Sequence, residues 1–236
     1  MDIEYLWNGI RLLQPDGAFR IGTDSVLISD FMTLPKGAKV CDLGSGSGTI
    51  SLLLCGRDAE CTVTGIELQE AAYQLFCKNI RENSLQDRIT PVLGDLRSIR
   101  DILPAGGFEC VVSNPPYFPV TSGGISPNDA LAIARTELCC TLEDICTAAQ
   151  WLLKYGGTLA VVHKPDRLCD LICTMRAHKI EPKKIRFVRH TQHSPVCLVM
   201  IEGKLGAKSG LTYSPDLLQY TEGGQETEEY RTIYHH

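Results

Sequence analysis

The sequence predicts an α/β fold in which helices cover both faces of a mostly parallel sheet. Segments with strand and helix patterns alternate from residue 39 to residue 178, which is typical of parallel sheets. The first of these strands, residues 39–43, runs directly into Gly44-Ser45-Gly46-Ser47-Gly48 and then into a helical pattern. A strand, a glycine turn and a helix in this order open a nucleotide-binding α/β unit, whose ligand lies at the C-terminal ends of the strands.

The chain is long enough for one globular domain. Its 236 residues are 44% hydrophobic and 22% charged, an ordinary composition for a packed core. We expect a hairpin in residues 1–18, the α/β core in residues 19–203 and a polar, loosely held tail in residues 204–236. No apolar run approaches the roughly 18 residues of a membrane span, and the start lacks a signal-peptide pattern. We therefore expect a cytoplasmic protein.

The expected elements follow from local signals. Asn8-Gly9 lies between two alternating segments and indicates the N-terminal hairpin, and a helix is expected to begin at Thr23 or Asp24. The main sheet should have seven strands, at residues 39–43, 61–67, 89–93, 108–113, 158–162, 184–189 and 196–202. The last two strands are joined too closely for a helical crossover, so they should pair antiparallel. After a loop at residues 119–128, helices are expected at residues 129–138, 141–154 and 165–178.

Eleven cysteines suggest neither a disulfide framework nor a metal site. The sequence contains no Cys-x-x-Cys pair and no Cys/His cluster with metal-finger spacing. We interpret the cysteines as small core residues in a reducing compartment, and we predict no metal.

The net charge of −5 conceals an uneven distribution. Residues 151–210 contain 11 Lys and Arg against 4 Asp and Glu, a local net charge of +7. A basic face of this kind can meet phosphates even when the whole protein is acidic.

Polar groups follow four of the expected strands and suggest the ligand. The glycine spacing is not the Gly-x-Gly-x-x-Gly of dinucleotide sites, and no Gly-Lys-Ser/Thr for a triphosphate is present. Asp42, just before the glycine turn, would repel a phosphate but suits a cationic ligand that carries an amino group. Glu67 lies roughly 20 residues past the turn, where an acid accepts hydrogen bonds from ribose hydroxyls. Asp95 follows the third strand.

The fourth strand ends at Asn114-Pro115-Pro116-Tyr117. Two prolines remove two backbone donors and fix two φ angles, and both residues that precede a proline are held extended. The turn is therefore stiff and presents outward-facing carbonyls beside an aromatic ring. The Asn114 side-chain oxygen and the Pro115 carbonyl can each accept one N–H of a planar amino group, which aims the nitrogen lone pair at an electrophile.

These motifs together resemble the class I S-adenosylmethionine-dependent methyltransferases, and specifically their amino-methylating branch. The resemblance covers about residues 19–203. Within that branch the chain looks like the tRNA1(Val) adenine-37 N6-methyltransferase group, and the segments that carry this finer likeness are residues 19–24, 114–118, 134–137, 163–168 and 182–186. The resemblance implies a Rossmann-like methyltransferase fold, S-adenosylmethionine as cofactor and an adenine in RNA, with tRNA favoured, as substrate.

The resemblance also implies roles for individual residues of the cofactor site. The glycine turn, which contains Gly44, Ser45, Gly46 and Gly48, lies against the methionine part of the cofactor. Asp42 orients this part, and Thr23 contacts its carboxylate. Glu67 holds the ribose hydroxyls and Leu68 adjoins it. Asp95 accepts from the adenine amino group, and Leu96 offers backbone beside the ring.

Further residues are implied for catalysis and substrate binding. Asn114, Pro115, Pro116 and Tyr117 form the catalytic turn, and Tyr117 and Phe118 stack on the target base once it has left its own stack. The remaining substrate candidates are cations, namely Arg135, Lys164, Lys183, Lys184, Arg186 and Arg189.

Three alternatives stay open from the sequence. The same turn would suit the N5-methylation of a glutamine in a protein such as a release factor, because that amide is also planar and weakly nucleophilic. An RNA-binding module without catalysis and a nicotinamide-dependent oxidoreductase are less consistent with the motifs. The sequence does not decide between a monomer and a dimer.

Overall fold

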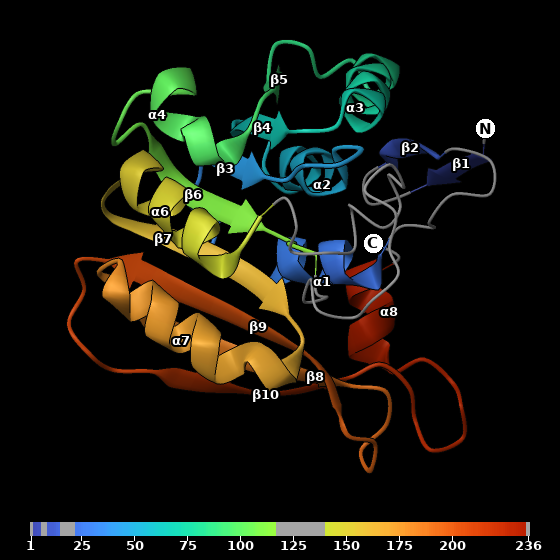
Figure 1. Ribbon diagram of the computed structural model, residues 1–236. Coiled ribbons are helices and arrows are strands. Elements are labelled where there is room, and N and C mark those ends of the chain that lie inside the picture. The colour runs from blue at the N-terminus through green and yellow to red at the C-terminus, as the bar shows by residue number, and fades with distance from the viewer. Residues whose placement is uncertain (1, 6–8, 15–21, 117–139, 235–236) are drawn as a thin grey trace, which may run out of the picture.

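The structure, a computed structural model, describes residues 2–5, 9–14, 22–116 and 140–234. It confirms the predicted α/β fold, since one eight-stranded sheet lies between two layers of helices (Figure 1). The strand order across the sheet is β10-β8-β9-β7-β6-β3-β4-β5. The strands are β3 (Lys39–Leu43), β4 (Thr62–Glu67), β5 (Ile89–Leu93), β6 (Phe108–Ser113), β7 (Leu153–His163), β8 (Ile180–Arg189), β9 (Val196–Leu205) and β10 (Thr212–Leu218).

Among the described strands of this sheet, only one runs against the others. β9 pairs antiparallel with both β7 and β8, as predicted for the last two expected strands. The remaining pairs, including β10 with β8, are parallel. The C-terminal ends of β3, β4, β5, β6 and β7 therefore meet at one edge of the sheet, where ligands of such folds lie.

The prediction of a loosely held tail is corrected by the structure. Residues 212–218 form the edge strand β10, so the sheet has eight strands rather than seven. The tail then ends in α8 (Glu228–Tyr234), which packs against the first helix of the core. Leu217, Tyr230 and Ile233 are buried. These few apolar side chains all face the core, which is why a segment of polar composition is nevertheless folded.

Helices cover the two faces of the sheet and enclose two apolar cores. One layer is α1 (Thr23–Phe31), α2 (Thr49–Arg57), α3 (Glu70–Glu82) and α8. The other is α4 (Ile99–Ile102), α6 (Leu142–Leu152) and α7 (Leu168–Ala177), with the 3₁₀ helices η2 (Leu96–Ser98) and η3 (Pro165–Arg167) near it. Alternate residues of β6 serve the two cores, Val112 the first and Val111 the second, as the pleat of a strand requires. The expected loop 119–128 and helix 129–138 lie outside the described residues.

The predicted N-terminal hairpin is confirmed. β1 (Asp2–Tyr5) and β2 (Arg11–Gln14) pair antiparallel, separate from the main sheet. Asn79 of α3 and Asn83, the residue just after this helix, hold β2 by its backbone. Asn83 Oδ1 accepts from the Arg11 N–H at 2.8 Å, and Asn79 Oδ1 accepts from the Leu13 N–H at 2.8 Å. Asn79 also donates to the Ser47 carbonyl at 2.9 Å, so the hairpin is tied to the glycine turn through one side chain.

The described cysteines are free thiols, and several are core residues as predicted. Cys169 and Cys173 differ, because both are exposed on α7. No helix in the described part of the chain combines the length and apolar character needed to cross a membrane.

Candidate active site

The glycine turn between β3 and α2 is built from three residues with positive φ. Gly44, Gly46 and Gly48 have φ values of 74°, 56° and 88°, which L side chains rarely adopt. The N–H groups of Gly44 and Ser45 donate to the Ile66 carbonyl at 3.0 and 2.9 Å, which fixes the turn against the end of β4.

Glycine is required in this turn for two different structural reasons. A Cβ at Gly48 would lie 2.0 Å from the Phe76 ring of α3, so close packing excludes any side chain there. A Cβ at Gly44 or Gly46 would meet no described atom within 4 Å. These two glycines therefore border open space, into which the backbone can receive a ligand.

Two buried polar atoms below the turn lack a hydrogen-bond partner among the described residues. Asp42 is fully buried, and its Oδ2 accepts from the Ser51 hydroxyl at 2.8 Å. Its Oδ1 and the Ser45 Oγ have no partner. Because unmade hydrogen bonds of buried groups are costly, this pair fits a ligand that carries a donor, such as the amino group of a methionine moiety.

Burial also affects the charge of Asp42. It raises the pKa of Asp42 to about 7, although the hydrogen bonds from Ser51 oppose the rise. A cationic ligand beside the carboxylate would favour its ionised form.

Glu67 ends β4 and braces the glycine turn. Its Oε2 accepts from the Gly46 N–H at 2.8 Å, and its Oε1 accepts from the Gln69 N–H at 2.7 Å. Burial raises the pKa of Glu67, and these backbone donors oppose the rise. Each carboxylate oxygen has a second lone pair, so a ribose hydroxyl can be accepted in addition. The neighbouring Leu68 is exposed.

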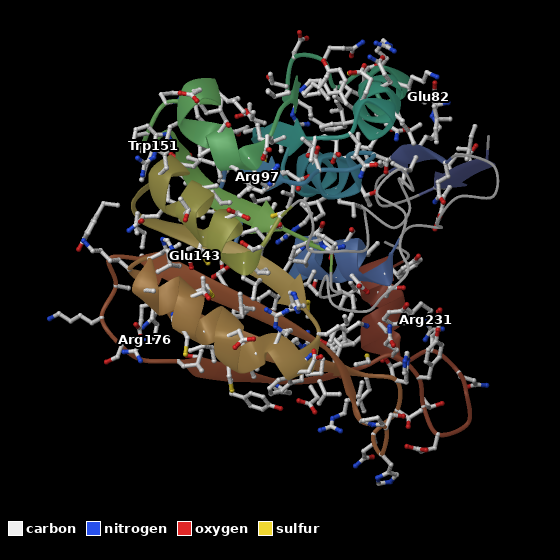
Figure 2. The ribbon with its side chains drawn as sticks, viewed as in Figure 1. Glu82, Arg97, Glu143, Trp151, Arg176 and Arg231 are labelled. Atoms are coloured by element: carbon white, nitrogen blue, oxygen red, sulfur yellow. The ribbon has the colours of Figure 1, made fainter. Side chains whose placement is uncertain are left out.

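Asp95, at the end of β5, is held by a residue that the sequence analysis did not single out. The Arg97 guanidinium donates to both Asp95 oxygens, with Nη2–Oδ2 at 2.5 Å, and the Arg97 N–H donates to Oδ1 at 2.9 Å. The hydrogen bond from the Arg97 side chain lowers the pKa of Asp95. Arg97, whose side chain is labelled in Figure 2, lies in η2, which packs against α6. Leu96 between them is buried.

The Asn114-Pro115-Pro116 turn leaves the C-terminal end of β6 directly beside the glycine turn. β3 and β6 pair in parallel with Leu43 opposite Ser113, and the Ser113 hydroxyl donates to the Leu43 carbonyl at 2.8 Å. Gly44 and Asn114 thus directly follow β3 and β6. Neighbouring strands of a sheet lie about 4.8 Å apart. Pro115 is buried and Asn114 is half-buried.

The first turn of α1 forms the wall next to Asn114. Ser25 Oγ accepts from Asn114 Nδ2 at 3.0 Å. Thr23 lies at the start of the same helix and forms a side-chain hydrogen bond with Tyr230 of α8. Burial raises the pKa of Tyr230, and this hydrogen bond opposes the rise. No sequence motif marks Ser25 or Tyr230 as a residue of the site. Tyr117, Phe118 and Arg135 lie outside the described residues.

The predicted basic residues of β8 have partners inside the protein. Lys184 Nζ donates to the Phe31 carbonyl at 2.6 Å and lies 4.1 Å from the centre of its ring. Arg186 pairs with Glu229 at 2.6 Å, and Arg189 pairs with Asp216 at 2.6 Å.

The other two cations differ in position. Lys183 Nζ reaches the Lys208 carbonyl at 3.1 Å, away from the strand ends. Lys164 follows β7 at the same edge of the sheet as Asn114. The structure therefore brings Asp42, Glu67, Asp95, Asn114 and Lys164 to one edge, whereas Lys183 and Lys184 lie along the middle of β8.

Residues 16–176 match the methyltransferase small domain family. The chain belongs to this family. Members and structural relatives agree with that assignment. The chain is 30% identical over 182 residues to a tRNA1(Val) (adenine(37)-N6)-methyltransferase of Porphyromonas gingivalis, covering 75% of this chain and 71% of the relative. It is 26% identical over 184 residues to the protein of the same name from Photobacterium profundum, covering 77% and 76%.

Solved structures show the same fold. A predicted O-methyltransferase from Agrobacterium tumefaciens superposes with a TM-score of 0.73 at 17% identity, over 89% of this chain and 94% of that one. The geranyl diphosphate C-methyltransferase of Streptomyces coelicolor, solved with S-adenosyl-L-homocysteine, gives a TM-score of 0.56 at 12% identity, over 76% and 77%. The predicted Rossmann-like methyltransferase fold is thus confirmed, and the predicted cofactor agrees with the family.

Proposed function

We propose that this methyltransferase transfers a methyl group from S-adenosylmethionine to the N6 amino group of an adenine in tRNA. The observation that carries the proposal is the neighbouring position of Gly44 and Asn114, which directly follow the paired residues Leu43 of β3 and Ser113 of β6. A cofactor against the glycine turn and an amine against Asn114 would be adjacent, as a direct transfer requires. When bound, the cofactor supplies an electrophilic methyl group on a sulfonium.

The residues of the chain would bind the cofactor along the strand ends. Asp42 Oδ1 and Ser45 Oγ fit the amino acid part, because both are buried without a partner among the described residues. Glu67 would accept from the ribose hydroxyls and Asp95 from the adenine amino group. Leu68 and Leu96 flank these two acids. Thr23 would meet the carboxylate from the start of α1.

At the target amine, Asn114 and Pro115 would act as two fixed acceptors. The Asn114 Oδ1 and the Pro115 carbonyl each accept one N–H, so the nitrogen lone pair is turned toward the methyl group. The new N–C bond forms as the S–C bond breaks, and the extra proton on nitrogen is lost to solvent. Pro116 keeps the turn stiff, and Tyr117 and Phe118 would stack on the base.

The choice of tRNA rests on the names of the relatives and on the basic region of the chain. A tRNA substrate also goes with the expected cytoplasmic location. Among the cations, Lys164 is the best placed, while Arg135, Lys183, Lys184, Arg186 and Arg189 remain candidates for phosphate contacts. A glutamine amide in a protein is the second candidate substrate, because the same two acceptors would hold it.

The test is methyl transfer from tritiated S-adenosylmethionine to bulk tRNA and, in parallel, to release factors, followed by nucleoside analysis of the RNA. We expect N6-methyladenosine in the tRNA and no label in the protein. Label in a glutamine of the release factor, with unlabelled tRNA, would overturn the choice of substrate. Absence of cofactor binding by calorimetry would overturn the proposed chemistry as a whole.

A further inference from the structure

The side chain of Asn114 is held by a residue from a distant part of the chain. Asn114 Nδ2 donates to Ser25 Oγ at 3.0 Å, across 89 residues of sequence. Ser25 belongs to the first turn of α1, and Asn114 follows β6. The bond therefore joins the wall of the site to its central turn.

Ser25 is itself fixed from several sides. Its N–H donates to the Gly22 carbonyl at 2.9 Å, and its carbonyl accepts from the Ser29 hydroxyl at 2.7 Å. The next residues of α1, Val26, Leu27 and Ile28, are at most 1% exposed. The hydroxyl is thus presented by a helix that is anchored in the core.

The contact restrains the Asn114 amide beside the substrate. The terminal torsion of an asparagine is broad and roughly two-fold, so the backbone alone leaves two orientations. With Nδ2 turned to Ser25, Oδ1 lies on the other side of the amide carbon. In the reversed orientation an N–H would face the N–H groups of the target amine, and the acceptor would be lost.

We propose that Ser25 is a positioning residue that restrains the Asn114 side chain with Oδ1 toward the target amine. The proposal rests on the proposed function, because it assumes that Asn114 Oδ1 accepts from the target amine. Ser25 acts through Asn114 and takes no part in the transfer itself.

The test compares Ser25→Ala with Ser25→Thr, which keeps the hydroxyl. At saturating substrates we expect kcat of Ser25→Ala to fall about 10-fold, less than the roughly 100-fold that a 1 Å misplacement can cost, with cofactor affinity and KM unchanged. Ser25→Thr should recover most of the lost kcat. Ser29→Ala is the matched control, since it removes a hydroxyl of the same helix that bonds the Ser25 carbonyl and not Asn114, and its kcat should fall much less than that of Ser25→Ala.

Three results would overturn the proposal. They are a wild-type kcat in Ser25→Ala, an equal loss in Ser29→Ala, and a loss that appears only as weaker cofactor binding. If release factors rather than tRNA prove to be the methyl acceptor, the same comparison is made with them, because only the choice of substrate has then failed.

A second measurement needs no substrate. The side-chain amide signals of Asn114, identified in a ¹⁵N spectrum by their loss in Asn114→Asp, should move much further in Ser25→Ala than in Ser29→Ala. If wild-type protein methylates neither acceptor, this spectrum still decides whether Ser25 holds the amide, and unchanged signals would reject the inference.

Discussion

Ser51 donates a hydrogen bond of 2.8 Å to Asp42 Oδ2, while Asp42 Oδ1 points to no partner in the described structure. One oxygen of the carboxylate thus belongs to the fold, and the other is available to a ligand. Because α2 carries Ser51 and β3 carries Asp42, the orientation of this acid is set by the same strand-turn-helix unit that forms the glycine turn.

Cofactor affinity should increase as the pH rises. Burial raises the pKa of Asp42 to about 7, so the unliganded protein still holds this proton at pH values where an unfolded chain has lost it. Stability from this group therefore falls as pH rises from about 4 to about 7. A cation prefers the ionised form, so S-adenosylmethionine should bind up to about tenfold more tightly at pH 8 than at pH 6.

Calorimetry at both pH values checks this expectation. Asp42→Asn should bind more weakly and keep only the pH dependence of the cofactor's own amine. Ser51→Ala should move the midpoint to higher pH, because the bond from Ser51 favours the ionised carboxylate. Identical pH profiles for the wild type and Asp42→Asn would show that Asp42 does not face the cofactor.

The replacement Asn114→Ala should separate binding from turnover. We expect the cofactor to bind as in the wild type and kcat to fall by at least about 100-fold, since an acceptor for the developing charge is removed. Single-turnover methyl transfer, with cofactor affinity measured alongside, gives both quantities. Turnover close to wild type would contradict the role of this turn.

Two glycine replacements should fail in different ways. Gly48→Ala places a Cβ 2.0 Å from the Phe76 ring at a φ of 88°, so we expect a loss of about 3 kcal/mol in the free energy of unfolding. Gly46→Ala meets no described atom and should lose only about 1–2 kcal/mol for its left-handed backbone. It should nevertheless weaken cofactor binding. Urea unfolding and calorimetry distinguish the two, and unaltered binding by Gly46→Ala would argue against a ligand at this turn.

We expect Arg186 to stabilise the fold, whether or not it also contacts RNA. Its side chain is 13% exposed and pairs with Glu229 of α8, so Arg186→Glu should destabilise the protein by about 2 kcal/mol. The exchange Arg186→Glu with Glu229→Arg should restore much of this stability. RNA affinity of the exchanged variant, measured against salt, then reports the phosphate contact alone. A single variant with wild-type stability would contradict the structural role.

The parts of the fold that the sequence predicted are those with strong local signals. The strand at residues 39–43 and the glycine turn are recognisable because their buried apolar residues and glycines are adjacent in the chain. Asn114-Pro115-Pro116 is recognisable for the same reason, since prolines restrict their immediate neighbours. Ser25 and Arg97 were missed. A serine two residues after Thr23 is interpreted from the sequence as part of a helix cap. The hydrogen-bond partner of Ser25, Asn114, is 89 positions away.

The tail shows why the remainder was not predictable. Pro215 lies inside β10, and a proline argues against a central strand. β10 is an edge strand whose register shifts between Ser214 and Leu217, so the missing N–H is tolerated. The local charge of +7 in residues 151–210 is partly offset for a related reason. Glu229 and Asp216 of the tail pair with Arg186 and Arg189 and neutralise part of that face.

The contact between Thr23 and Tyr230 has a consequence for biosynthesis. Thr23 opens the helix that holds Asn114, whereas Tyr230 is translated more than 200 residues later. Chains fold from the N-terminus during synthesis, so the ribosome releases the glycine turn and the Asn-Pro-Pro turn well before α8 can cover α1. We expect a nascent chain to pair β3, β4, β5 and β6 early but to gain methyl-transfer activity only after α8 has been synthesised.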